Sequence, residues 1–245
     1  MSPHKAPFFD AYQATVHCEV KDLLEAFEGL TPGSQYRHLS RVPHGYAFGN
    51  SLDDADGQMG QFWWGGRFVH PHVSFQGHAS HQAGMLLREC FPTHYPSRID
   101  PVLIDSMEPG AYDVLQDACL SIARDLRVKV GTAGDHLVTF EGRTLRLGSE
   151  KSTALLRLYD KAAERRAKLN DPDKLASLPE HWARVEAQIR PHGREARLAA
   201  ASASPEALLG SARWLQAAAQ AIAGLDVPRF DASPVWRQSD HDRSY

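Results

Sequence analysis

The 245-residue sequence lacks long hydrophobic runs, and no apolar stretch approaches the ~18 residues that a membrane-spanning helix needs. Its amino-terminal residues, MSPHKAPFFDAY, contain no apolar core of a signal peptide. The three cysteines, Cys18, Cys90 and Cys119, lie far apart and form no CxxC pair of the kind that binds zinc. These absences predict a cytoplasmic protein with reduced thiols and no contact with a membrane.

The sequence also lacks a strong overall charge, because its formal net charge is −3. This argues against a protein that coats DNA through charge alone, but it leaves room for one local basic face. Residues 151–199 hold eleven Lys/Arg and seven Asp/Glu, so this segment carries +4 and the remainder carries −7. We interpret the segment either as a solvated helix face or as a surface that contacts phosphates.

Strand and helix patterns alternate along the chain, and 42% hydrophobic residues are enough to bury a core. This order predicts an α+β fold, a mostly antiparallel sheet with helices packed on one side, built from two related halves that each resemble a ferredoxin-like unit. The expected strands cover residues 9–20, 45–48, 61–64, 69–76, 98–105, 137–140, 144–148, 154–160 and 181–190. The expected helices cover 22–27, 81–90, 111–126, 162–169 and 205–224, with a linker at 170–179.

We expect a single domain over residues 1–230, followed by a disordered tail at 231–245. The chemistry-bearing motifs fall within 69–190, and a helical C-terminal part covers 193–224.

Polar and apolar residues alternate in four of the expected strands, and alternate residues of a strand point to opposite faces. The segment TALLRLYDK places Arg157, Tyr159 and Lys161 on one face. In the segment HWARVEAQIR, the residues that point to one face are Trp182, Arg184, Glu186, Gln188 and Arg190. If the strands pair in one sheet, this face gathers a tyrosine, carboxylates, arginines and a lysine. The alternative is an ordinary solvated sheet face.

The residues on such a face could catalyse phosphoryl transfer. A phenol is a poor nucleophile at neutral pH because its ordinary pKa is about 10, and nearby cations or a metal favour the phenolate. Hard divalent ions prefer oxygen ligands, so Asp100 and Glu186 are the natural candidates to hold Mg²⁺ or Mn²⁺. Attack by Tyr159 on a phosphodiester would keep the bond energy in a phosphotyrosine, which a DNA 3′-hydroxyl could then reverse.

The stretch TLRLGSEKSTALLRLYDKAAERR, followed by HWARVEAQIR, resembles the signature of rolling-circle replication initiators. The resemblance is to the replication initiation factor family of small Gram-positive plasmids and filamentous phages. In chain order, the matching residues are Ser74-Phe75-Gln76-Gly77, then Arg98, Asp100 and Asp105, then Gly148, Ser149 and Ser152, then Tyr159-Asp160-Lys161 with Glu164-Arg165, and finally Arg184 and Glu186. The ordered set spans roughly residues 69–190.

The resemblance implies origin-specific nicking of one DNA strand by a tyrosine, with a divalent metal and commonly as a dimer. Carried over residue by residue, it gives Tyr159 as the nucleophile and Lys161 and Arg184 as catalytic contacts of the scissile phosphate. It gives Asp100 and Glu186 as metal ligands. Asp105 joins them only if the strand bulges or ends there, because its parity is opposite to that of Asp100. The implied DNA-binding residues are Gln76, Arg98, Ser149, Lys151, Arg157 and Arg190.

The implied partners are double-stranded origin DNA, the single-stranded nick product, and a host helicase and polymerase. Two departures from the family pattern stand out. The element that often reads Ser-Gly-Gln-Gly is only partly matched by SFQG. Family members are also often longer than 245 residues, so elements that bind the origin would be reduced here or supplied by a partner.

Other interpretations remain open at this point. His70-Pro71-His72 is similar to the His-hydrophobic-His metal motif of other rolling-circle nucleases, although proline is a poor middle residue for a strand. His38 and Arg41 could be mistaken for the HxxR motif of a tyrosine recombinase, whose helical catalytic domain the strand-rich pattern contradicts. The cluster Phe62-Trp63-Trp64 could stack bases or lie in the core. A DNA-binding replication or copy-control protein that keeps the fold without nicking is the alternative to an enzyme.

Overall fold

The computed structural model describes residues 6–55 and 57–230, and the tail expected at 231–245 lies outside this part of the chain. Its strands form one ten-stranded sheet in the order β2-β3-β4-β5-β1-β6-β10-β9-β8-β7, and every pairing is antiparallel. The strands are β1 (Phe8–Thr15), β2 (Gln35–His38), β3 (Phe48–Asp54), β4 (Gly57–Trp64), β5 (His72–Gln76), β6 (Tyr95–Ser106), β7 (Val130–Ala133), β8 (Thr144–Leu147), β9 (Ala154–Asp160) and β10 (Ala183–Ile189).

Eight helices accompany the sheet in the described residues: α1 (Val20–Phe27), α2 (Ser80–Cys90), α3 (Ala111–Asp125), α4 (Lys161–Lys168), α5 (Pro172–Ala176), α6 (Arg194–Ser202), α7 (Pro205–Leu209) and α8 (Arg213–Ala223). The expected α+β class, with an antiparallel sheet, is confirmed. Within the described part of the chain, no helix is long and apolar enough to cross a membrane.

The chain folds as two halves with the same sequence of elements. The first runs β1-α1-β2-β3-β4-β5-α2, and the second runs β6-α3-β7-β8-β9-β10-α6, with α4 and α5 inserted before β10. The strand orders also correspond, because β2-β3-β4-β5-β1 repeats as β7-β8-β9-β10-β6, and the halves meet where β1 pairs with β6. Each half thus differs from the β-α-β-β-α-β order of a ferredoxin-like unit, while the expectation of two related halves holds.

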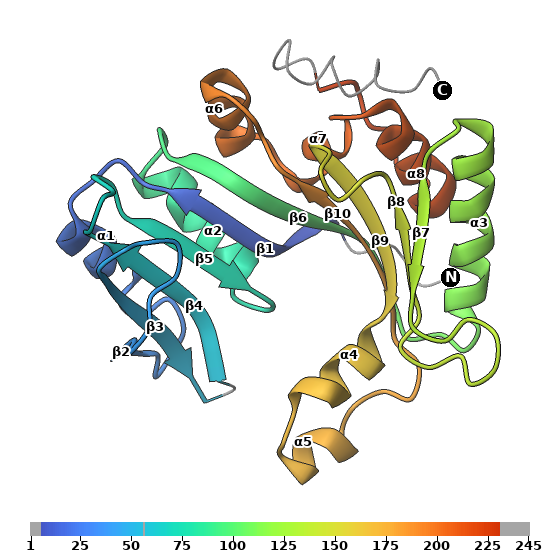
Figure 1. Cartoon of the computed structure of the whole chain (residues 1–245), viewed down its shortest axis with the longest axis horizontal. Coiled ribbons are helices and arrows are strands. Elements are labelled where there is room, and N and C mark those ends of the chain that lie inside the picture. Colours follow the sequence, from blue (N-terminus) through green and yellow to red (C-terminus); the bar gives the residue numbers. More distant parts are fainter. Residues whose placement is uncertain (1–5, 56, 231–245) are drawn as a thin grey trace.

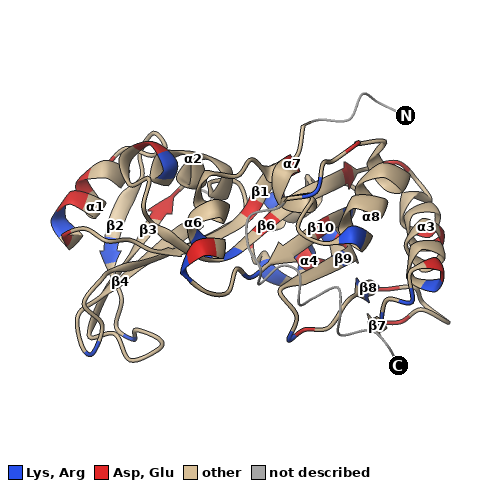
Figure 2. Ribbon diagram, turned by 90° about the horizontal axis from the view of Figure 1, so that it is seen from above, with Lys and Arg blue, Asp and Glu red and all other residues tan. Residues whose placement is uncertain are grey.

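The sheet bends into an arch, and most helices cover its outer face (Figures 1 and 2). Alternation explains this layering, because Val73 and Phe75 of β5 and Leu156 and Leu158 of β9 point into the core under the helices. The packing against α2 is close: a side chain on Gly84 would meet the rings of Tyr12 and Phe9 at under 3.0 Å. The other face of the sheet, here called the open face, carries polar residues.

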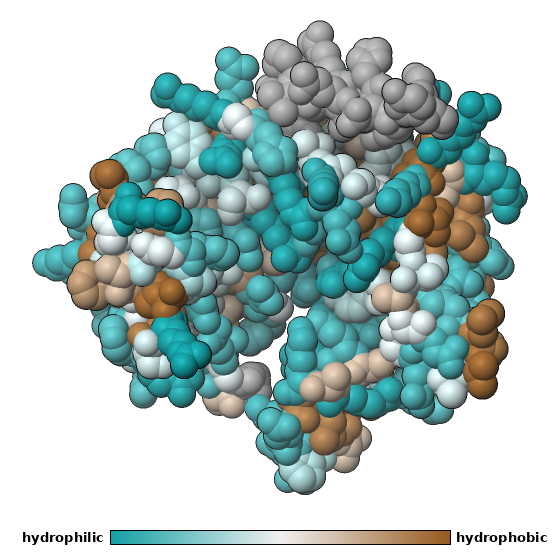
Figure 3. All heavy atoms as spheres, in the orientation of Figure 1, coloured by the Kyte–Doolittle hydropathy of each residue, from teal (hydrophilic) through white to brown (hydrophobic). Residues whose placement is uncertain are grey.

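An arm made of α4 and α5 projects from the end of β9 beneath the arch (Figure 1). Asp160 begins α4 by accepting a hydrogen bond from the Ala163 N–H, and Pro172 occupies the first turn of α5. Lys174 Nζ donates a hydrogen bond to the carbonyl oxygen of Ala55 over 3.3 Å, which joins the arm to the β3–β4 hairpin. The space-filling view shows an opening between the first half and this arm (Figure 3).

Several expected elements differ from those observed. Residues 137–140 were predicted as a strand, but Asp135 accepts hydrogen bonds from the N–H groups of Leu137, Val138 and Thr139, which fixes a loop there. The strand of this region is β7, earlier in the chain. The predicted linker at 170–179 contains α5, and β3 covers Phe48–Asp54 where a strand was expected at 45–48.

The predicted helix at 205–224 is broken into α7 and α8. The break follows Gly210, whose backbone packs so closely on the Pro228 carbonyl that an added Cβ would lie 2.2 Å from its oxygen.

Candidate active site

Tyr159 lies on β9 with its side chain on the open face. Its hydroxyl donates a hydrogen bond to Glu186 Oε2 on β10 over 3.0 Å, and Lys161 Nζ donates to the same hydroxyl over 3.3 Å. The Arg157 guanidinium lies 4.2 Å from the ring centroid, and Tyr159 is 3% exposed. Burial and the negative charge of Glu186 raise the pKa of Tyr159, so the phenol is neutral in this arrangement.

Two carboxylates, Glu186 and Asp100, are buried next to one another, each 1% exposed. Burial raises the pKa of Glu186 to about 7; the Arg157 guanidinium opposes this rise and the nearby Asp100 adds to it. Burial also raises the pKa of Asp100, against the charge and hydrogen bonds of Arg98. Arg157 donates to Glu186 Oε1 through Nε over 3.0 Å, and Arg98 Nε donates to Asp100 over 2.9 Å. A cation that replaced these arginines would relieve the repulsion between the carboxylates.

A bulge in the β6–β10 pairing decides where Asp105 points. Glu186 is opposite Val102 while Val185 is opposite Ile104, so one residue of β6 is unpaired and the parity changes. Asp105 therefore shares the open face with Asp100, which meets the condition set from the sequence. Its contacts are different, however, because it accepts hydrogen bonds from Arg184 Nε over 2.9 Å and Trp182 Nε1 over 2.5 Å.

Asp10, on β1, is a site residue that the sequence analysis missed. Its carboxylate accepts a hydrogen bond from Arg184 Nη1 over 2.6 Å and lies 3.6 Å from Lys161 Nζ. Lys161 also pairs with Glu164 of α4 at 2.7 Å. Asp10 thus fixes two of the predicted catalytic cations at once. The available signal was a single carboxylate in the otherwise uncharged strand FFDAYQAT.

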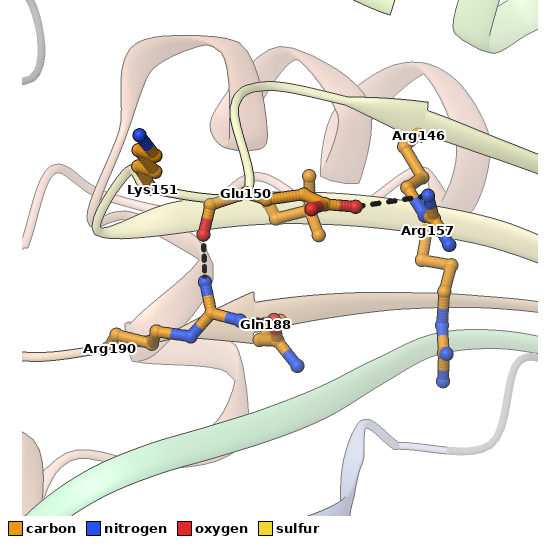
Figure 4. A pocket seen from close by; sticks show the side chains of 7 residues that line it. Arg146, Glu150, Lys151, Arg157, Gln188 and Arg190 are labelled. Carbon is orange, nitrogen blue, oxygen red and sulfur yellow. Dashed lines mark hydrogen bonds and ion pairs between the residues drawn. The ribbon is translucent and has the colours of Figure 1, made fainter. Parts of the chain in front are cut away.

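A basic pocket of about 380 Å³ opens beside this cluster on β8, β9 and β10 (Figure 4). It is lined by Arg146, Glu150, Lys151, Leu155, Arg157, Gln188 and Arg190. Glu150 holds two of the arginines, since Arg146 donates to its carboxylate over 3.0 Å and Arg190 donates to its backbone carbonyl. Three of the residues predicted to bind DNA, Lys151, Arg157 and Arg190, therefore share one cavity.

The remaining predicted DNA-binding residues are spread over the same side of the sheet. Arg98 is tied to Asp100, and Ser149 lies in the turn before β9, where its hydroxyl accepts a hydrogen bond from the Lys151 N–H. Gln76 is exposed at the end of β5, in the first half.

Of the three carboxylates predicted to bind a divalent ion, two are placed to do so. Within residues 6–55 and 57–230, no group of three or more His, Cys, Asp or Glu side chains is arranged to hold a metal ion. Mg²⁺ is commonly bound through one or two carboxylates, with water and substrate phosphates completing its shell. Asp100 and Glu186 meet this requirement, whereas Asp105 is engaged by Arg184 and Trp182.

The alternative motifs have other contacts. His70 stacks on His17 with ring centroids 4.1 Å apart, while His72 stacks on Trp63 at 5.3 Å, so the two histidines face different partners. Phe62 packs in the core against Phe27 and Phe75.

The four polar strand faces singled out from the sequence thus belong to one sheet, with a tyrosine, two buried carboxylates and paired cations on its open face.

Among solved structures, the chain is similar to a rolling circle replication initiator protein from Geobacillus stearothermophilus. The two share 16% sequence identity with a TM-score of 0.55, over 96% of this chain and 95% of that chain. At this identity the likeness shows a common fold, and it confirms the fold that the motifs implied. Comparisons with protein-family models and with curated proteins find no match.

Proposed function

We propose that this chain is a rolling-circle replication initiator that nicks and rejoins one DNA strand at an origin through Tyr159. The observation that carries the proposal is the convergence of Tyr159, Lys161 and Glu186 within hydrogen-bond distance on the open face. The fold shared with an initiator supports it. The basic pocket, which continues from this cluster through Arg157, supplies a surface for phosphates.

In the proposed reaction, Tyr159 Oη attacks the phosphorus of the scissile phosphodiester. A bond forms between phosphorus and Oη while the bond from phosphorus to the 3′ oxygen breaks. The phenol proton passes to Glu186 Oε2, its hydrogen-bond acceptor, and the departing 3′ oxygen takes a proton from solvent. The products are a 5′-phosphotyrosine and a free 3′-hydroxyl, and the reverse reaction rejoins the strand.

Lys161 and Arg184 are the residues we assign to the scissile phosphate. Asp10 holds both side chains, which limits their motion before the substrate binds. Because Arg157 covers the phenol ring, substrate entry requires this arginine to turn away, and the adjoining basic pocket gives it a phosphate to contact.

We assign Mg²⁺ or Mn²⁺ to Asp100 and Glu186, in place of their arginine partners. When bound there, the ion would neutralise charge on the transferring phosphate and lower the pKa of the attacking hydroxyl. The free 3′ end would prime leading-strand synthesis by a host polymerase with a host helicase, and the protein would act as a homodimer.

The proposal is tested with supercoiled DNA of the replicon that encodes the chain. Incubation with Mn²⁺ should convert it to the open-circular form, and Tyr159→Phe should abolish this conversion while the Kd for DNA changes by less than about twofold. Nicking that persists in Tyr159→Phe would remove Tyr159 from the reaction.

The burial of Tyr159 and the pairing of both carboxylates with arginines favour one further candidate, a DNA-binding replication or copy-control protein with this fold. Tight DNA binding without nicking by the wild-type protein would support that function instead.

A further inference from the structure

A row of polar side chains crosses the open face of the first half at one level of the sheet. Successive strand pairings place, opposite one another, Arg37 and Ser51, Ser51 and Gln61, Gln61 and Ser74, Ser74 and Gln13, and finally Gln13 and Arg98. Directly paired residues of neighbouring strands point to the same face. The row crosses five strand spacings, roughly 24 Å. It ends beside the candidate active site, because Arg98 donates to Asp100.

The chemistry of this row differs from that of the basic pocket. Its centre consists of amides and hydroxyls, and Arg37 at its far end is already paired with Asp53. Ser51 and Ser74 are buried, whereas Gln13 and Gln61 are partly exposed. Phosphates are bound mainly by Lys and Arg, whereas Asn and Gln amides read the hydrogen-bonding edges of bases. The row is therefore suited to bases rather than to the sugar-phosphate backbone.

An aromatic pair lies next to the row. Trp63 and His72 are directly opposite on β4 and β5, two residues from Gln61 and Ser74, and so on the same face. Their rings stack with centroids 5.3 Å apart and an interplanar angle of 9°. Trp63 Nε1 donates to Gln61 Oε1 over 3.1 Å, which fixes the orientation of that amide. Trp63 is 7% exposed and also contacts the rings of His44 and Tyr46, so the pair acts here by holding the Gln61 amide in place.

The Trp63–His72 pair occupies the position in the first half that corresponds to Tyr159 and Arg184 in the second half. Trp63 is the penultimate residue of β4, as Tyr159 is of the corresponding strand β9, and both lie on the open face. The opposite residues correspond as well, since His72 begins β5 and Arg184 is the second residue of β10. The first half thus carries a stacking pair where the second half carries its tyrosine and arginine. The two positions lie on one continuous sheet.

We propose that the open face of β1, β4 and β5 binds the unstacked bases of single-stranded DNA that leads to Tyr159, through Gln13 and Gln61, with the Trp63–His72 pair orienting the Gln61 amide. The inference rests on the proposed function for the identity of the ligand as DNA. It adds a base-contacting surface in the half of the molecule that lacks the tyrosine. The basic pocket then serves the phosphates on the other side of the nick.

The test compares binding of three fluorescent 30-mers: a random-sequence single strand, an abasic strand of the same length, and the random duplex. The double variant Gln13→Ala/Gln61→Ala should raise the Kd for the random single strand at least fivefold. Its Kd for the abasic strand should stay within about twofold of wild type. Gln220→Ala, the same change on the exposed end of α8, is the matched control and should leave all three values unchanged.

All variants are measured in the Tyr159→Phe background, so binding is read without cleavage and a failure of the nicking reaction leaves this test intact. An equal loss on the random and abasic strands, or no loss on either, would overturn the inference. A loss confined to the duplex would overturn it in favour of duplex binding.

A second measurement needs no variant. A single strand that contains 5-iododeoxyuridine should crosslink on irradiation to the tryptic peptide of residues 42–67, which contains Gln61 and Trp63. Crosslinks found only in peptides of the second half would contradict the proposal.

Discussion

Tyr159 and Glu186 are bound to each other across the β9–β10 pair, by a hydrogen bond of 3.0 Å from the phenol to Oε2. Both side chains are buried, and burial, followed by the negative charge of Glu186, raises the pKa of Tyr159. The phenol is therefore held protonated next to its acceptor. A positively charged group that reaches this pair lowers the pKa of Tyr159, which favours the attacking phenolate.

Removing the charge of Glu186 tests its assignment. Glu186→Gln keeps an oxygen to accept the Tyr159 hydrogen bond but loses the negative charge that would hold the metal. We expect Mn²⁺-stimulated nicking to fall at least 100-fold, with DNA affinity retained. Nicking rates measured against Mn²⁺ concentration provide the check, with Glu25→Gln on the exposed face of α1 as the control. An unchanged Mn²⁺ dependence would contradict the assignment.

Asp10 is expected to be a structural requirement of the site. Asp10→Asn would leave Arg184 and Lys161, both largely buried, without the carboxylate that they share. Loss of one partner from a buried ion pair typically costs about 3 kcal/mol, so the free energy of unfolding should fall by roughly that amount in urea titrations. Asp22→Asn on α1 is the matched change and should alter stability by less than about 0.5 kcal/mol. Equal stability of the two variants would show that Asp10 is dispensable.

The basic pocket should contribute to the salt dependence of DNA binding. Lys151 is exposed at its rim, so Lys151→Gln removes one contact with a phosphate. The slope of log K against log salt for a single strand should decrease in magnitude by about 0.7. Lys21→Gln, on the exposed surface of α1, should leave the slope unchanged. A Lys151→Gln slope identical to that of wild type would place the DNA elsewhere.

His72 should make stability depend on pH. Burial lowers the pKa of His72 from 6.5 to about 4, with a smaller contribution from His44. The unfolded chain therefore takes up a proton between pH 6.5 and 4 that the folded chain does not bind, and stability is lost as pH falls through this window. The contribution is on the order of 1–3 kcal/mol and is fully present above pH 6.5.

Urea unfolding of wild type and His72→Gln at several pH values measures this contribution. The difference between the two proteins should shrink as pH falls from 6.5 to 4. A difference that stays constant over this range would mean that His72 does not titrate with a lowered pKa.

Much of the sheet could be predicted from alternation alone. Strand β9 was expected at 154–160 and lies there, because LLRLYD pairs buried leucines with polar residues at a period of two. The same alternation of two residues correctly predicted that Arg184, Glu186 and Gln188 share one face of β10. The hydrogen bond from Tyr159 to Glu186 requires this arrangement. Helix α3 was found from its apolar spacing within one residue of its end.

The site could be predicted less fully, because it depends on non-local register. Nothing near Asp10 in the sequence shows that β1 lies between β5 and β6, which is what brings its carboxylate to Arg184. The bulge that turns Asp105 to the open face is likewise a property of the β6–β10 pairing. The duplication of the halves is visible in strand order and left no repeat in the sequence.

The measurement that tests the central claim most directly is the identity of the residue that becomes joined to DNA. A 5′-end analysis of the covalent product, after incubation with Mn²⁺ and trypsin digestion, should find the nucleotide on the peptide Leu-Tyr-Asp-Lys. Trypsin releases this peptide between Arg157 and Lys161, and Tyr159 is its only tyrosine. A nucleotide mapped to any other peptide, or nicking without a covalent product, would contradict the account.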